Sequence, residues 1–212
     1  MPRRPFRFPF AAFAALALPL AAVATPACAQ NEVPAAERKL QKEANKEFER
    51  IAKRFIATST RFSPVDATML GEHDYDSELP DITPLGRTTR AAEWSALLTG
   101  LAMLDQARLS RDNQVDQELL ANELRLRLWS LDTMQDWAWN PQVYNDAAAG
   151  SLYLLAARDF APWSKRLKSA TARMEALPGF LAETRRQLVP ARVPRVFAET
   201  VASQNGGIVE VA

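Results

Sequence analysis

Histidine and cysteine are nearly absent from this sequence. Its 212 residues include one histidine, His73, and one cysteine, Cys28. A catalytic zinc usually takes three protein ligands drawn from His, Cys, Asp and Glu, and a nucleophilic triad needs a base that a third group holds in place. One histidine leaves almost no room for either arrangement. We therefore predict no catalytic residue, no metal site and no cofactor within the chain itself.

Glycine is also scarce, and no stretch shows the alternation of apolar and polar residues that is typical of a half-buried strand. Only five of the seven glycines precede Gly206. Ala, Leu, Arg and Glu are abundant, and these residues favour helices. No internal repeat is present. The sequence therefore predicts an all-α fold, with an irregular array of several helices rather than a symmetric bundle.

The N-terminus has the three zones of a secretory signal peptide. Three arginines within the first seven residues form a basic region, and an apolar run interrupted by two prolines follows from Phe8 to Ala24. Ala27 and Ala29 then supply the small residues that a signal peptidase requires. We predict that residues 1–29 are a signal peptide, that cleavage follows Ala29, and that the mature chain is periplasmic, with no stable membrane span.

Lipidation of Cys28 is the alternative to cleavage after Ala29. In that case Cys28 becomes the first residue of a lipid-anchored protein. A lipoprotein signal normally carries leucine at the position of Thr25. The sequence therefore favours cleavage over lipidation.

The predicted mature chain, residues 30–212, is nearly neutral and has no cysteine. Removal of three arginines from the 26 basic residues leaves 23 against 25 acidic ones, a formal net charge of −2. A nucleic-acid-binding protein needs a basic excess, so we exclude nucleic acid as a partner. Because no disulfide can form after export, the stability of the fold must come from packing.

Apolar residues at three- and four-residue steps predict a first helix from about Leu40 to Ile56. Its charged opposite face is either solvated or a surface for a partner. Ser63 is expected to cap a short helix that begins at Pro64 and ends at Gly71. An extended connector with two prolines follows. Further helices are expected at residues 88–107, 114–134, 142–157, 162–176 (with Asp159 as a possible cap) and 195–203, with another that ends at Leu188.

Two breaks are expected near the C-terminus. Leu177-Pro178-Gly179 should separate two helices, and Asn205-Gly206-Gly207 should end the last one. The apolar residues 208–212 then read as the beginning of a new buried element, and an exposed apolar tail would be a poor end for a domain. We therefore expect residues 30–212 to be a helical domain that is incomplete at its C-terminus.

Five residues are candidates for lining a cleft or binding a substrate. His73 lies in a polar loop with Asp76 and either lines a cleft or makes local hydrogen bonds within a turn. One alternative is that Asn140 and Tyr144 face a substrate groove. The other is that Asn140 caps a helix, while Tyr144 packs against the protein with its hydroxyl at the surface. Arg158 either holds a substrate carboxylate or pairs with an acid such as its neighbour Asp159.

Several stretches resemble, in order, one bacterial family, the domain of unknown function 885 family. They are Gly71-Glu72-His73-Asp74-Tyr75-Asp76, Leu79-Pro80-Asp81, Val115-Asp116-Gln117-Glu118-Leu119-Leu120, Trp139-Asn140-Pro141-Gln142-Val143-Tyr144, Leu154-Leu155-Ala156-Ala157-Arg158, Pro178-Gly179-Phe180-Leu181 and Glu199-Thr200-Val201-Ala202-Ser203-Gln204. The resemblance extends from about Ala44 to Gln204.

The resemblance implies a parent class similar to helical zinc peptidases. Members of the family look like longer, mostly helical proteins whose His-Glu-x-x-His zinc motif lies downstream of the region matched here. Nothing in this sequence matches that motif, so the resemblance transfers no zinc ligand and no catalytic base; zinc is expected only in a full-length relative. The first hypothesis is therefore the N-terminal helical portion of an exported zinc-peptidase-like protein, inactive alone, which meets a peptide substrate only through the full-length protein. The second is a stand-alone periplasmic helical module for binding or scaffolding.

Overall fold

The computed structural model describes the backbone of residues 34–211 and the side chains of residues 34–206. The described residues form helices joined by short connectors and contain no strand, which confirms the predicted all-α fold. In residues 34–211 we find no helix that combines the length and the apolar character needed to cross a membrane. The predicted signal peptide, its cleavage site and Cys28 lie outside the described residues.

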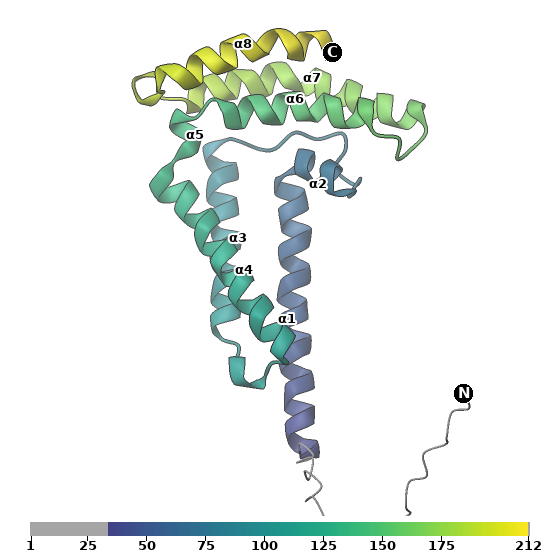
Figure 1. Cartoon of the computed structure of the whole chain (residues 1–212), viewed down its shortest axis with the longest axis vertical. Helices are drawn as coiled ribbons and strands as arrows, with labels where there is room; N and C mark the ends of the chain where they lie inside the picture. Colours follow the sequence, from purple (N-terminus) through teal and green to yellow (C-terminus); the bar gives the residue numbers. More distant parts are fainter. Residues whose placement is uncertain (1–33, 212) are drawn as a thin grey trace, which may run out of the picture. The chain divides into compact units, whose positions relative to one another are not determined.

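The helices follow one another in the order shown in Figure 1. Their bounds are α1 Ala35–Phe62, α2 Pro64–Leu70, α3 Pro84–Ala102, the 3₁₀ turn η1 Gln106–Arg108, α4 Arg111–Trp129, the π-helical turn η2 Ser130–Met134, α5 Asp136–Trp139, α6 Gln142–Ala157, α7 Trp163–Gln187, the 3₁₀ turn η3 Pro190–Arg192 and α8 Arg195–Val211.

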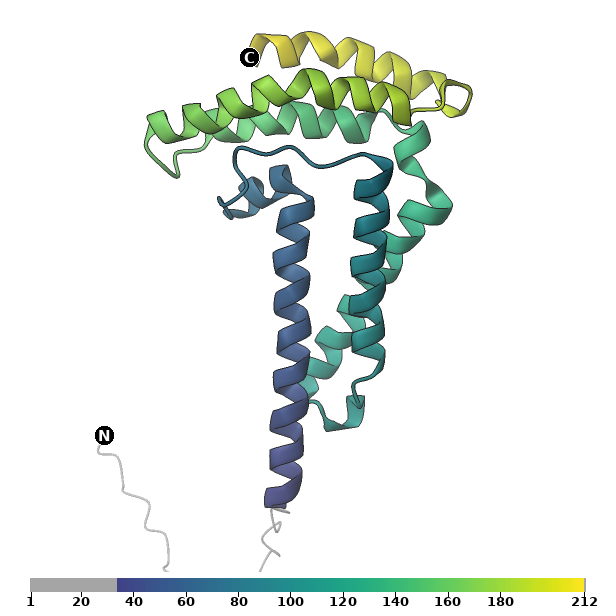
Figure 2. The same ribbon diagram turned by 180° about the vertical axis from the view of Figure 1, so that it is seen from behind.

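The first hydrophobic core lies between α1, α3 and α4, and these three helices pack against one another. The helices α3 and α4 form an antiparallel pair, joined through η1 (Figures 1 and 2). Leu124 of α4 is completely buried, and burial of one leucine side chain contributes roughly 1.5–3 kcal/mol. The buried members of this core are Phe48, Ile51, Trp94, Leu97, Leu101, Leu109, Ala121 and Leu124.

The second core lies between α6 and α7, with α8 packed on α6. Figure 2 shows these three helices lying along one another. Tyr144 and Ala148 of α6 meet Phe180 of α7, and Leu79 and Ile82 from the connector before α3 pack against them. The short helix α2 contacts both α1 and α6. The connector and α2 therefore join the two cores.

The boundaries of α2 and α3 follow from turn chemistry. Gly71 ends α2 in the left-handed region, with φ of 92°, which glycine adopts without a steric penalty. Thr83 caps α3 by accepting a hydrogen bond from the backbone N–H of Gly86, at 3.1 Å. The predicted cap of α2 is wrong, because the Ser63 side chain accepts no hydrogen bond from the helix; Pro64 is the first residue of α2, as predicted.

Several predicted helix ends are wrong. The third helix begins at Pro84 and ends at Ala102, so Pro84 is its first residue rather than part of the extended connector. The fourth α-helix ends at Trp129, and the π-helical turn η2 begins at the next residue, Ser130. Asp159 does not cap α7, which begins after Pro162.

The two predicted C-terminal breaks are also absent from the helices. The helix α7 continues without interruption through Pro178, and the backbone of α8 remains helical through Gly206 and Gly207 to Val211. Both Pro178 and Gly179 lie on the exposed side of α7, where water can replace the hydrogen bond that proline cannot donate. A new buried element was predicted for residues 208–212. This prediction is wrong for residues 208–211, because their backbone extends α8.

Candidate functional site

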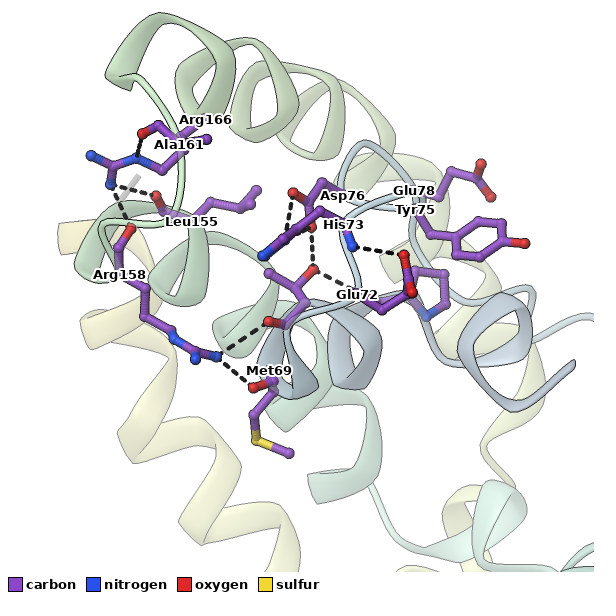
Figure 3. Close-up of polar contacts among 12 residues, drawn as sticks. Met69, Glu72, His73, Tyr75, Asp76, Glu78, Leu155, Arg158, Ala161 and Arg166 are labelled. Carbon is purple, nitrogen blue, oxygen red and sulfur yellow. Dashed lines mark hydrogen bonds and ion pairs between the residues drawn. The ribbon is translucent and has the colours of Figure 1, made fainter. Parts of the chain in front are cut away.

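Two of the predicted site residues, His73 and Asp76, form a side-chain pair directly after α2 (Figure 3). The His73 Nδ1 atom lies 3.1 Å from Asp76 Oδ2, and the imidazole stacks on the ring of Phe160 with centroids 3.7 Å apart. Asp76 is 5% exposed, and its Oδ1 atom also accepts a hydrogen bond of 2.7 Å from the Thr68 hydroxyl. The pair is therefore already engaged with neighbouring groups of the protein.

Arg173 of α7 forms hydrogen bonds to the same region. Its side chain is completely buried, and burial lowers the pKa of its guanidinium to about 10, although the negative charges of Asp76 and Glu78 oppose that shift. The guanidinium donates hydrogen bonds to five acceptors: Glu78 O at 3.0 Å, Ser151 O at 2.9 Å, Pro64 O at 3.2 Å, Thr68 Oγ1 at 2.9 Å and Tyr75 O at 3.4 Å. Thr68 thus connects Arg173 to the Asp76 carboxylate.

Two further arginines donate to the carbonyls at helix C-termini. Arg158 donates to the carbonyls of Thr68, at 3.2 Å, and Met69 at the end of α2 (Figure 3). Arg166 donates to Leu155 O and Ala156 O, both at 3.2 Å, at the end of α6. A cation at this end of a helix satisfies free carbonyls and complements the helix dipole.

The structure brings together three of the five predicted site residues, His73, Asp76 and Arg158, around the C-terminus of α2. The geometry of His73 is that of a turn histidine with local hydrogen bonds, and a role in a substrate cleft stays a prediction. Arg158 does not pair with Asp159, which forms its ion pair with Arg166 at 3.1 Å, and no ion pair among residues 34–206 includes Arg158. Residues 34–206 contain no group of three His, Cys, Asp or Glu side chains placed to hold a metal ion.

Asn140 and Tyr144 lie elsewhere, around the start of α6. Asn140 Oδ1 accepts a hydrogen bond of 3.0 Å from the backbone N–H of Gln142. Tyr144 is 4% exposed, and its hydroxyl donates to the carbonyl of Trp137 at 2.6 Å, so the expectation of a surface hydroxyl is wrong. Burial raises the pKa of Tyr144 to about 12.

Tyr144 also lines a cavity of about 460 Å³, which we call the Arg90 pocket. Residues from α1 to α7 and the connector before α3 line it. Five aromatic side chains contribute to its wall: Phe62, Trp94, Trp137, Tyr144 and Phe180. Its charged lining residues are Arg87, Arg90, Arg127, Asp66, Asp136 and Asp146. A volume of this size and a mostly apolar wall with a few polar groups are typical of small-ligand sites.

The three arginines of the Arg90 pocket differ in how their charge is balanced. Arg127 forms an ion pair with Glu123 at 2.7 Å. Arg90 donates to two carbonyls, Asp81 O at 3.0 Å and Gly86 O at 3.4 Å. Burial, the largest cause, lowers the pKa of Arg90 below its ordinary value, against the opposing charge of Asp81. Arg87 donates to Ile82 O at 3.1 Å and lies 3.8 Å from the centroid of the Trp137 ring.

The pocket contains one buried donor without a partner. Among the described residues, the indole Nε1 of Trp94 is one of two buried side-chain polar atoms that make no hydrogen bond; the other is Gln117 Oε1, in a different part of the fold. Trp94 is 7% exposed and belongs to the lining of the Arg90 pocket. Such groups are rare in folded proteins, since leaving one unpaired costs roughly 1–3 kcal/mol.

Tyr144 was among the residues that the sequence offered for a groove, whereas the arginines of this pocket were not predicted. A signal was present, because Arg87, Arg90 and Trp94 are spaced by three and four residues and therefore share one face of α3. Placing the helix start at residue 88 excluded Arg87 from that pattern. The contributions of α5, α6 and α7 to the pocket depend on tertiary packing and have no local signal.

Comparisons with known proteins place the chain in context. The family model for bacterial proteins of unknown function, DUF885, matches residues 64–212. Among solved structures, the chain is similar to a protein of unknown function from Shewanella oneidensis that is provisionally described as a lipoprotein, with 28% identity and a TM-score of 0.72. The match covers 77% of this chain and 29% of that protein, so the chain spans less than a third of its length. No curated protein matches the chain.

Proposed function

This chain belongs to the DUF885 family of bacterial proteins of unknown function, and from that premise we propose that it is the N-terminal helical portion of an exported hydrolase similar to zinc peptidases. In this proposal the chain contributes one wall of a peptide-binding cleft and is inactive alone. The 29% coverage of the Shewanella protein supports a role as part of a longer protein.

The Arg90 pocket carries the proposal. Its volume of about 460 Å³ suits the end of a peptide rather than a folded partner. Aromatic side chains supply apolar contact area, and Arg87 and Arg90 supply hydrogen-bond donors on the same face of α3. The combination of an apolar wall and a few convergent donors is suited to a peptide side chain together with a polar backbone group.

The described residues do not fit a catalytic zinc. His73 already contacts Asp76 and Phe160, and residues 34–206 contain no cluster of three metal-ligating side chains. In this proposal the chain therefore binds and positions the peptide, and no chemical step uses a metal held by the described residues.

Peptide binding to the full chain tests the proposal. The probe is acetyl-Ala-Leu-Phe, and the readout is isothermal titration calorimetry supported by quenching of tryptophan fluorescence. We expect saturable binding at one site per chain, with no hydrolysis of the peptide. A Val143→Trp substitution should weaken binding at least tenfold, because Val143 lines the pocket and its exposed side chain can be enlarged toward the cavity.

The matched control is Val196→Trp, which adds the same bulk to an exposed valine of α8 outside the pocket. This variant should bind the peptide as the unmodified chain does. Thermal unfolding of both variants checks that the substitutions leave the fold intact. Absence of peptide binding, or equal effects of the two substitutions, would contradict the proposed site. Peptide hydrolysis by the isolated chain would contradict the proposed inactivity.

A stand-alone helical binding module is the second candidate function. It is favoured by the two hydrophobic cores, both of which are built from side chains of the described residues. A chain of this kind should unfold in one cooperative transition and remain monodisperse. Binding of a hydrophobic dye by the native chain, with a broad thermal transition, would count against it and favour the partial-protein proposal.

A further inference from the structure

The lining of the Arg90 pocket also indicates which chemical group of a peptide the pocket recognises. We propose that Arg90 binds the free C-terminal carboxylate of a peptide whose last side chain is apolar. The inference rests on the proposed function of the pocket, and it assigns a ligand class and a specificity-determining residue to it.

The charge on Arg90 lacks a carboxylate partner. Its guanidinium has five N–H donors, and the structure shows two of its nitrogens donating to carbonyls, Asp81 O at 3.0 Å and Gly86 O at 3.4 Å. None of the ion pairs among residues 34–206 includes Arg90. A half-buried cation in this state is desolvated without full compensation, and its pKa is lowered accordingly.

The nearby acidic residues form no ion pair with Arg90, although the charges of Asp81 and Asp136 oppose the lowering of its pKa by burial. Asp136 lies at the start of α5, where its Oδ1 atom accepts a hydrogen bond of 2.8 Å from the N–H of Trp137. Asp66 and Asp146 have exposed side chains, which are solvated. Arg87, one turn before Arg90, also forms no ion pair and adds positive potential on the same face of α3. An anion that enters the pocket therefore meets two cations without carboxylate partners.

A carboxylate matches this arrangement better than other anions do. Guanidinium binds carboxylate through two parallel hydrogen bonds, a geometry that a lysine cannot reproduce. The aromatic wall, which includes Trp94, Trp137 and Phe180, excludes a ligand that is charged throughout and favours one with an apolar body next to its charge. The end of a peptide with an apolar last residue has both parts. Inorganic phosphate has only the charge.

The test compares acetyl-Ala-Leu-Phe as the free acid and as its C-terminal amide, measured by calorimetry on the full chain. We expect the acid to bind at least tenfold more tightly than the amide, because charge-assisted hydrogen bonds contribute more than neutral ones. Arg90→Gln should lower the affinity for the acid about tenfold or more and leave the affinity for the amide within twofold. Arg111→Gln, at the exposed start of α4, is the matched control and should preserve the preference for the acid.

Each outcome decides between the inference and the proposed function. Equal binding of acid and amide would overturn the inference and leave a peptide site, whereas no binding of either would overturn both. A preference for the acid that persists in Arg90→Gln would also overturn the inference, and so would competition by inorganic phosphate as effective as that of the free acid. Should Arg90→Gln unfold, Arg90→Lys keeps the charge without the two-pronged geometry and is expected to reduce the preference for the acid. An undiminished preference in Arg90→Lys would overturn the assignment of Arg90.

Discussion

Replacement of Arg173 by methionine is expected to be the most destabilising change of a charged residue in the described part of the chain. Methionine has a similar length and fits an apolar environment, so the substitution removes the charge and the donors with little change in volume. Four backbone carbonyls and the Thr68 hydroxyl, which accept hydrogen bonds from the guanidinium, then lose this donor inside the protein.

The magnitude follows from burial and from the number of acceptors. Each acceptor left unpaired costs roughly 1–3 kcal/mol, but the gain from no longer burying a charge offsets part of the sum, since burial lowers the pKa of Arg173 to about 10. We expect the free energy of unfolding to fall by about 3–5 kcal/mol, which is the range for breaking a buried charged network. The loss of stability in Arg173→Lys should lie between zero and the loss in Arg173→Met, because an ammonium keeps the charge but cannot reach acceptors on several sides at once.

The assay is equilibrium unfolding in urea at neutral pH, with the free energy taken by linear extrapolation. Arg186→Met is the matched control on the same helix. Its guanidinium forms an ion pair with Glu183 at 2.6 Å but is 66% exposed, and exposed pairs contribute at most about 1 kcal/mol. If Arg173→Met loses no more stability than Arg186→Met, the buried hydrogen bonds of Arg173 do not hold α7 against the connector, and the reasoning is refuted.

Two further predictions concern Tyr144 and two glycines. Because burial raises the pKa of Tyr144 to about 12, the folded chain keeps the phenolic proton at pH values where the unfolded chain has lost it; the stability from this group is complete below pH 10 and lost toward pH 12. Urea midpoints should therefore fall less steeply between pH 10 and 12 in Tyr144→Phe than in the unmodified chain, and an equal slope would contradict this. Gly86→Ala should lower the melting temperature strongly, because the added Cβ would lie 2.6 Å from the carbonyl oxygen of Asp81. Gly179→Ala should instead stabilise α7 by about 0.5–1 kcal/mol, because its Cβ would have no neighbouring atom within 4 Å. Melting temperatures in the reverse order would contradict the second prediction.

The sequence predicted some helix ends that local chemistry decides, but it missed the Thr83 cap at the start of α3. The bounds of the helix at residues 142–157 are confirmed, and Gly71 ends α2 as expected. The prediction of a break at Pro178 is wrong because its local signal competes with packing: Leu177 and Phe180 on either side contribute to the second core. Tertiary contacts of this kind stabilise a helix that its sequence alone would interrupt.

The candidate site was less predictable, because its residues meet over long separations in the sequence. His73 and Asp76 are three residues apart, and their contact follows from a turn. Arg173, by contrast, reaches Glu78, which is 95 residues away, and no periodicity within α7 indicates that one arginine of the helix is buried while Arg186 is exposed. The family resemblance is confirmed over residues 64–212, but it names no ligand for the Arg90 pocket.

The arginines of this chain show why a charge count predicts so little about function. Arg87, Arg90, Arg158, Arg166 and Arg173 all donate to backbone carbonyls at helix ends or in connectors. In most of these cases the carbonyls are what the guanidinium is there to satisfy, because helix C-termini and extended connectors leave acceptors without partners. Arg87 and Arg90 differ, since both also line the Arg90 pocket and neither forms an ion pair with a carboxylate. That difference, rather than the presence of arginine, separates residues that hold the fold together from residues available to a ligand.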